Sequence, residues 1–296
     1  MRNAETTALQ CLRVEVAGGV AQGDDPCGAS SGQQTASSGN PKTPTRCRCF
    51  APVWYDDHME NKPPRHLMAY TDESGRLGKD NLFFFGTLWC ERSTARRMRS
   101  ALKQVRTDLM FNDTMHFTEM SNLRGEAYVR AARAVSAIPG WSMRVLIYRK
   151  THDSSGKPYD FTHYGQKRDP VALKRARAYN KLLHDHLSAI VRYHPASFWT
   201  LYIEDRNRPR DDNGKEYIQR ALESYYVKHV AFLPKRDDDL LQVIDLLLGA
   251  YAEQAYRTCG VERAFPPGAR KQRVAAEVME AIRGHCKPAW VWTPRT

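Results

Sequence analysis

Residues 67–75 read LMAYTDESG and residues 82–90 read LFFFGTLWC, and these two stretches decide the fold. The first has the composition of a short strand, residues 67–72, that ends in a turn. The second is a continuous apolar run rich in aromatic residues, which is typical of a strand covered on both faces. Because the link at residues 74–81 is short and polar, we expect the two strands to pair as an antiparallel hairpin.

Downstream of the hairpin, segments with helical and strand character alternate. The interleaving predicts an α/β domain built from layers of helices on a sheet. The helix expected at residues 239–256 is apolar almost all round, which predicts that it is buried. The other helices are expected at 93–110, 124–137, 170–193, 214–226 and 271–283, and the other strands at 141–149, 197–204 and 227–233.

The N-terminal part differs in composition from the rest of the chain. Residues 18–48 are rich in Gly, Ser, Gln, Thr and Pro and contain scarcely an aliphatic side chain. Such a segment buries too little apolar surface to offset the entropy lost on ordering. We therefore expect residues 1–64 to be a disordered low-complexity tail, or to follow a start codon assigned too early. Residues 65–296 would form one domain with a closing C-terminal helix.

Composition excludes several classes of protein. The 296 residues are 42% hydrophobic and 26% charged, as in globular domains. No apolar run approaches the roughly 18 residues of a membrane helix, and no secretory signal is recognisable. The seven cysteines show no repeated spacing, which argues against a disulfide framework or a zinc site. We expect a cytoplasmic protein without a membrane partner.

The charge balance points to a polyanionic partner. The formal net charge is +12, and an excess of this size favours binding to phosphate backbones. Nucleic acid is the expected partner, although the sequence does not distinguish DNA from RNA. A solvated helix face remains the alternative for the basic residues of the helix at 93–110. The candidate nucleic-acid contacts are Arg92, Arg96, Arg97, Arg99 and Lys103.

Acidic residues occupy positions where an apolar core is expected. Asp72 ends the first strand, Glu204 and Asp205 end another, and Asp245 lies inside the apolar helix. A buried, unpaired carboxylate costs several kcal/mol, so each needs a cation or a donor. For Asp245 this could be a structural pair with an arginine. A cluster of such acids is tolerable mainly around a divalent metal, and oxygen ligands suit Mg2+ or Mn2+.

Four acidic motifs resemble those of a large prokaryotic family of domains of unknown function in the RNase H-like superfamily. They are residues 71–75 (TDESG), 116–119 (HFTE), 203–206 (IEDR) and 240–245 (LLQVID). The resemblance covers residues 67–256, and the order and spacing of the four motifs are more specific than any single one.

The resemblance implies an RNase H-like mixed sheet flanked by helices, with four acids meeting at one place. Matched residue by residue, these catalytic and metal-binding acids are Asp72, Glu119, Asp205 and Asp245. Together they would hold two Mg2+ or Mn2+ ions, with Asp72 bridging both.

Two of these assignments have competitors. Glu126 could replace Glu119. Glu204 could replace Asp205, since strand alternation lets only one of the two neighbours face the site. His116 could shuttle a proton, although a solvent-facing or structurally satisfied histidine is the commoner case. The candidates for supporting roles are Glu73, His116, Glu204 and Gln242.

The predicted function is metal-dependent hydrolysis of phosphodiester bonds in nucleic acid. One alternative is a nucleic-acid-binding or assembly module that kept the fold and lost catalysis. Another is a hydrolase of a small phosphorylated molecule. The sequence does not predict an oligomeric state.

The composition of the N-terminal segment yields a prediction about its removal. A chain that begins near Pro64 should be expressed, fold and still bind divalent metal, because residues 1–64 contribute little apolar surface. Circular dichroism and Mn2+-dependent thermal shifts of the full and shortened chains measure this. Loss of folded protein on truncation would contradict it.

Overall fold

The structure is a computed structural model that describes residues 64–75, 82–119, 124–149, 166–206, 209, 211–258 and 268–292. The predicted tail, residues 1–64, lies outside the described residues apart from Pro64.

The described strands form a six-stranded mixed sheet in the order β5-β4-β1-β2-β3-β6. The predicted antiparallel hairpin is confirmed, because β1 pairs antiparallel with β2, and β2 in turn pairs antiparallel with β3. Strand β4 runs parallel to β1, β5 parallel to β4, and β6 parallel to β3. The strands are β1 (His66–Ser74), β2 (Leu82–Glu91), β3 (Trp141–Arg149), β4 (Phe198–Glu204), β5 (Val227–Leu233) and β6 (Trp290–Trp292).

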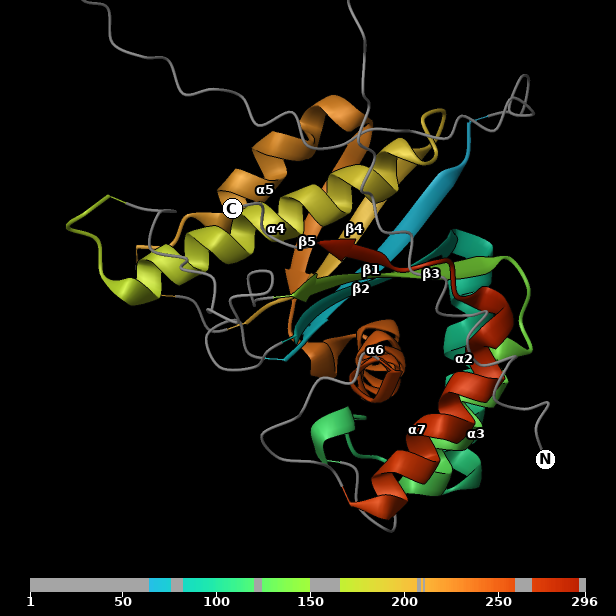
Figure 1. Ribbon diagram of the computed structural model, residues 1–296. Coiled ribbons are helices and arrows are strands. Elements are labelled where there is room, and N and C mark those ends of the chain that lie inside the picture. Colours follow the sequence, from blue (N-terminus) through green and yellow to red (C-terminus); the bar gives the residue numbers. More distant parts are fainter. Residues whose placement is uncertain are drawn as a thin grey trace, which may run out of the picture. The chain divides into compact units, whose positions relative to one another are not determined.

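Helices cover both faces of this sheet (Figure 1). Helices α4 (Val171–Arg192) and α5 (Gly214–Leu222) lie on one face. The other face carries α2 (Arg92–Asp108), α3 (Gly125–Ser136), α6 (Asp239–Thr258) and α7 (Ala269–Ile282). Short 3-10 turns lie at Phe117–Glu119 (η1), Glu223–Tyr225 (η3), Lys235–Asp237 (η4) and Arg283–His285 (η5). Among the described helices, none is long and apolar enough to cross a bilayer.

Side chains of each strand alternate between two cores. Met68 and Tyr70 of β1 pack with α6 and its neighbours, whereas Leu67 and Ala69 pack with α4. This is the period-two pattern of a strand that is buried on both faces. The predicted α/β class, a mixed sheet flanked by helices, is therefore confirmed.

Two local predictions differ from the structure. The helix expected at 214–226 ends at Leu222 and continues as η3, after which Tyr226 takes a left-handed conformation with φ of 59°. Strand β6 was not predicted, because its three residues are too few to show a period-two pattern.

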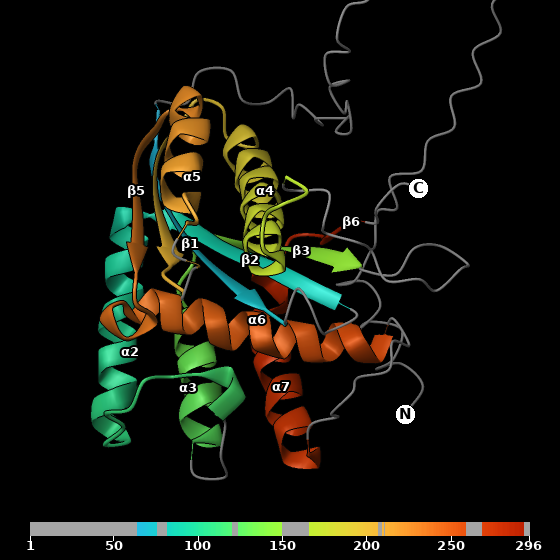
Figure 2. The same ribbon diagram turned by 90° about the vertical axis from the view of Figure 1, so that its left-hand side faces the viewer.

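Helix α6 is buried as predicted and packs closely on the sheet and on η1. Figure 2 shows it on the opposite side of the sheet from α4 and α5. A Cβ atom at Gly86 of β2 would lie 2.8 Å from Leu248 Cδ1, and one at Gly249 would lie 2.2 Å from Phe117 Cγ. Glycine at these two positions lets β2 and the loop around Phe117 approach the helix.

We predict that Gly249→Ala lowers the free energy of unfolding by about 1–3 kcal/mol, the usual cost of overpacking a core. The added methyl group would overlap Phe117 and displace the 115–119 segment. Urea unfolding measures the change. Gly284→Ala is the control, because no atom lies within 4 Å of its added Cβ, and we expect a change within about 0.5 kcal/mol. Equal effects of the two variants would contradict the close packing.

Candidate metal centre

The site begins where β1 and β4 end. The parallel register pairs Thr71 with Ile203, so that the following residues, Asp72 and Glu204, lie side by side on the α6 face of the sheet. The Asp72 residue is 1% exposed. Its Oδ1 accepts a hydrogen bond of 2.7 Å from the backbone N–H of Glu73. Two carboxylates are therefore held together at the edge of an apolar core.

A third carboxylate and a lysine complete the cluster. Asp245 projects from the second turn of α6, and Lys235 comes from η4, between β5 and α6. The Lys235 Nζ lies 3.0 Å from Asp72 Oδ2 and 2.9 Å from Asp245 Oδ1. It also lies 3.1 Å from Glu204 Oε1. The Lys235 side chain is 10% exposed, so one ammonium group neutralises part of a buried triple carboxylate.

The second oxygen of Asp245 binds the loop that carries the HFTE motif. Asp245 Oδ2 lies 2.8 Å from His116 Nδ1 and accepts a 2.7 Å hydrogen bond from the backbone N–H of Phe117. The other ring nitrogen of His116, Nε2, lies 3.2 Å from Thr118 Oγ1. Asp245 thus connects the carboxylate cluster to a partly exposed histidine.

Glu73 lies on the far side of the cluster and contacts α4. Its Oε2 accepts a 2.6 Å hydrogen bond from the Tyr179 hydroxyl, and its Oε1 lies 3.6 Å from an Arg206 nitrogen. Ligand oxygens of Asp72, Glu73 and Glu204 all lie within 4.8 Å of one another. This spacing and the oxygen-only chemistry fit a hard divalent cation.

Burial and the neighbouring charges shift the pKa values of the cluster. Burial, the adjacent Glu204 carboxylate and the charge of Asp245 raise the pKa of Asp72 well above its usual value, against the effect of Lys235. Burial also raises the pKa of Glu73. For Asp245 burial acts in the same direction, but the His116 hydrogen bond and the Lys235 charge outweigh it and lower the pKa to about 2.

The lysine responds in the opposite way. Burial alone would lower the pKa of Lys235, but the charges of Asp72, Asp245 and Glu204 raise it above its usual value. At neutral pH Lys235 is therefore a permanent cation among acids.

Two residues named from the sequence, Asp205 and Gln242, lie outside the cluster. Asp205 turns away from the cluster, and its Oδ2 forms a 2.8 Å ion pair with Lys215 Nζ. Strand alternation is the reason, since Glu204 faces Asp72 and its neighbour cannot. Gln242 Oε1 accepts hydrogen bonds from Arg106 and from the Met115 N–H, so it fixes the loop and lies outside the cluster.

The two candidates for the middle acid also differ in position. Glu126 forms an ion pair with Arg130 on the surface of α3. Glu119 is the last residue of η1, and its side chain lies outside the described part of the structure. A metal-binding role of Glu119 stays a prediction.

The sequence reasoning missed Lys235 altogether. Its signal was weak, because Lys235 belongs to a charged run of five residues, KRDDD at 235–239, that is typical of a solvated turn. A cation placed directly before a buried helix that carries an internal acid was the available clue.

The basic residues of α2 point in different directions. Arg97 donates to Thr94 Oγ1 and to the Pro139 carbonyl oxygen, and Lys103 is exposed. Arg92, Arg96 and Arg99 line a groove next to β1.

Comparison with known proteins finds similarity to solved structures only. No protein-family model matches the chain, and no curated protein matches it. Bst-RNase HIII in complex with Mn2+ aligns with a TM-score of 0.36 and 17% identity, over 74% of this chain and 63% of that one. A point mutant of Bst-RNase HIII aligns with a TM-score of 0.34 and 15% identity, over 74% and 62%. RNase HII of Archaeoglobus fulgidus, from its complex with PCNA, aligns with a TM-score of 0.35 and 13% identity, over 73% of this chain and 90% of that one.

The chain thus spans less than two thirds of the length of the two RNase HIII chains. These likenesses concern the fold. The strand order and the flanking helices give the mixed sheet flanked by helices that the sequence predicted.

The cluster yields a prediction about Lys235. In EDTA, Lys235→Met should lower the free energy of unfolding by about 3–5 kcal/mol, because it leaves buried carboxylates without their cation. Millimolar Mn2+ should restore much of this loss by neutralising the same acids. Thermal unfolding with and without Mn2+ measures both effects.

Lys215→Met is the matched control. It also removes a lysine from a carboxylate partner, but the side chains of that pair are 43% and 30% exposed, so we expect a loss of at most about 1 kcal/mol. Equal melting temperatures of the two variants in EDTA would contradict the central role of Lys235.

Proposed function

We propose that the chain is a metal-dependent nuclease that hydrolyses phosphodiester bonds of nucleic acid. One observation carries this proposal: oxygens of Asp72, Glu204 and Asp245 converge within 3.1 Å of one ammonium nitrogen, at a largely buried point between two strand ends and a helix. Burying three acids together costs free energy that packing alone would avoid, since apolar residues of similar size are often more stabilising. A site built at such a cost is typical of catalysis.

The donor set fits Mg2+ or Mn2+. Asp72, Glu73 and Glu204 would hold a divalent ion, because their ligand atoms are close and are all hard oxygens. Asp72 Oδ2 accepts no directed hydrogen bond from the described residues and has the Lys235 ammonium as its neighbour. When bound, such an ion supplies Lewis-acid stabilisation of the phosphoryl oxygens and a more acidic water.

The motifs also imply that the site binds two metal ions, and this is a further part of the proposal. A second ion held by Asp72 and Asp245 would take the position of the Lys235 Nζ, so that lysine would have to move. With Lys235 in place, its ammonium group would supply a second positive charge near a phosphate bound at the site. Glu119 is the remaining candidate ligand.

His116 is suited to move a proton. Asp245 Oδ2 lies 2.8 Å from its Nδ1 and orients the ring, so that Nε2, which lies 3.2 Å from Thr118 Oγ1, is the nitrogen that would exchange a proton. The carboxylate also stabilises the imidazolium form, as a general acid for the leaving oxygen requires.

Charge and motif order support a nucleic-acid substrate. The net charge of +12 attracts a polyanion, and the motifs resemble the RNase H-like family named above, to which we propose that the chain belongs. The competing functions are a binding module without catalysis and a hydrolase of small phosphorylated molecules. Binding that weakens log-linearly with salt would favour the polymer over the small molecule.

Two neighbouring acids provide a matched test of the site. Glu204→Gln should lower cleavage at least about 100-fold, because even an indirect metal partner is worth 10–100-fold. Asp205→Asn should leave cleavage nearly unchanged, since that carboxylate pairs with Lys215 instead. The assay incubates labelled single-stranded DNA, RNA, duplex DNA and RNA–DNA hybrid with Mg2+, Mn2+ or EDTA.

The outcomes separate the alternatives. Cleavage with either ion that EDTA abolishes supports the nuclease. Binding of oligonucleotides without any cleavage would favour the inactive module. Loss of cleavage in Asp205→Asn with full activity in Glu204→Gln would contradict the assigned geometry.

A further inference from the structure

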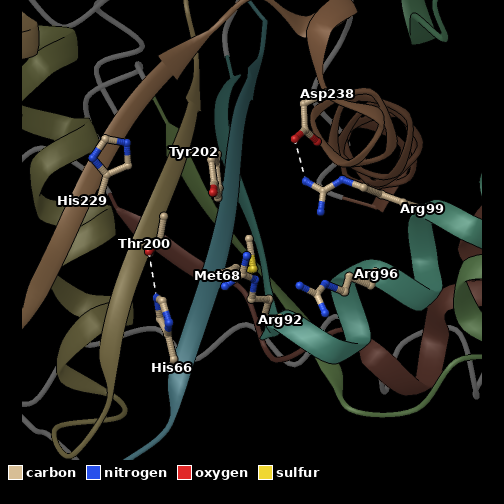
Figure 3. A pocket seen from close by; sticks show the side chains of 9 residues that line it. All are labelled: His66, Met68, Arg92, Arg96, Arg99, Thr200, Tyr202, His229 and Asp238. Carbon is tan, nitrogen blue, oxygen red and sulfur yellow. Dashed lines mark hydrogen bonds and ion pairs between the residues drawn. The ribbon is translucent and has the colours of Figure 1, made fainter.

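A second feature lies on the same face of the sheet as the metal centre. A groove of about 460 Å3 separates the first half of α2 from strands β1, β4 and β5. Figure 3 shows arginines from α2 on one side of it and histidines from the strands on the other. The lining residues are His66, Met68, Arg92, Arg96, Arg99, Thr200, Tyr202, His229 and Asp238.

One wall of the groove is a row of arginines. Arg92, Arg96 and Arg99 follow the spacing i, i+4, i+7 and therefore share one side of α2. Arg99 is committed to structure, because it donates to Asp238 Oδ2 at 2.7 Å and to the Tyr70 hydroxyl at 3.0 Å. Arg92 and Arg96 are exposed and form no hydrogen bond or ion pair with any residue of the described part of the chain.

The opposite wall contributes hydrogen-bonding side chains, and the carboxylate among the lining residues is already paired. His66 Nε2 lies 2.9 Å from Thr200 Oγ1, and His229 of β5 is exposed at the rim. Asp238 is the acid among the lining residues, and its carboxylate is taken up by Arg99 and by two backbone N–H groups of α6. The groove therefore has two uncompensated guanidinium groups and suits an anion.

The floor of the groove leads directly to the carboxylates. Tyr202 stacks on Tyr70 with ring centroids 5.1 Å apart. The next residues of their strands on the same face are Glu204 and Asp72. At about 3.3 Å per residue, the groove residue Thr200 lies roughly 13 Å from Glu204 along β4. A single phosphate group is too short to reach both places, whereas a strand of several nucleotides can.

We propose that this groove binds the sugar-phosphate backbone of the nucleic-acid strand whose scissile bond lies at the metal centre. Arg92 and Arg96 contact phosphates displaced from that bond, and the planar guanidinium fork matches phosphate oxygens. The proposal rests on the nuclease function and adds the path of the substrate. It also separates the basic residues of α2 that line the groove from Arg97 and Lys103, which do not.

The test compares two double variants of the full chain that lose the same charge from the same helix. Fluorescence anisotropy measures binding of a labelled 20-nucleotide DNA and the same RNA, in EDTA, over a range of NaCl concentrations. Arg92→Gln/Arg96→Gln should weaken binding about tenfold or more and lower the slope of log affinity against log salt by about 1.5–2, because two phosphate contacts are lost. Arg97→Gln/Lys103→Gln should change the slope by less than about 0.5.

Equal slope changes in the two double variants would overturn the groove, since long-range charge would then explain both. The proposal would also be overturned if the unaltered chain bound neither oligonucleotide. It would be overturned as well if poly-glutamate displaced the DNA with equal affinity and with the same dependence on Arg92 and Arg96, because this would indicate an acidic protein partner. Thermal unfolding checks that both double variants are folded.

The assignment of the groove as a backbone-binding site and the proposed nuclease function can be contradicted independently. If Glu204→Gln loses cleavage while Arg92→Gln/Arg96→Gln binds and cleaves normally, the function stands and the groove assignment falls. If Arg92→Gln/Arg96→Gln loses binding while the unaltered chain cleaves no substrate, the groove stands and the nuclease falls. The Mn2+ thermal shift should be the same in this double variant and in the unaltered chain, since neither arginine contacts the cluster.

Discussion

The structure depends on one electrostatic interaction, the contact of the Lys235 ammonium with two buried carboxylates, Asp72 and Asp245, and one half-buried carboxylate, Glu204. Each partner alone would be costly to bury, since an uncompensated charge in a core costs several kcal/mol. Together they connect three elements that are distant in sequence: the end of β1, the end of β4 and the second turn of α6. The charges still do not balance, because Lys235 supplies one positive charge for three acids. A divalent ion on Asp72, Glu73 and Glu204 would supply the missing charge.

The apolar packing around the cluster positions its members. Gly86 allows α6 to lie close to β2, and Gly249 allows Phe117 to lie against α6. The Phe117 N–H and His116 then reach Asp245. The acid inside the apolar helix is thus satisfied on one side by a loop and on the other by Lys235. Packing and electrostatics are coupled, because a displaced loop would leave a buried carboxylate without two of its donors.

Positive and negative groups are separated along one face of the sheet. The carboxylates lie at the carboxyl ends of β1 and β4, while Arg92 and Arg96 lie over the beginning of the same strands (Figure 3). The stacked rings of Tyr70 and Tyr202 occupy the space between. Under the proposed function, a polyanion that approaches this face would be attracted at the groove and would meet the carboxylate cluster at the other end. The strand alternation that builds the core also places both features on one surface.

The sequence by itself determined the hairpin of β1 and β2, the buried helix α6 and the position of Asp72 and Asp245 at places where acids are unusual. These follow from local patterns, because hydrophobic periodicity and the cost of burying a charge act within a few residues. Only the tertiary structure decided between Glu204 and Asp205, since alternation requires one to face α6 but does not say which face α6 covers. The contacts of Lys235 likewise could not be predicted from the sequence. Its partners lie on β1, β4 and α6, and a contact among three distant segments leaves no periodic signal in the chain.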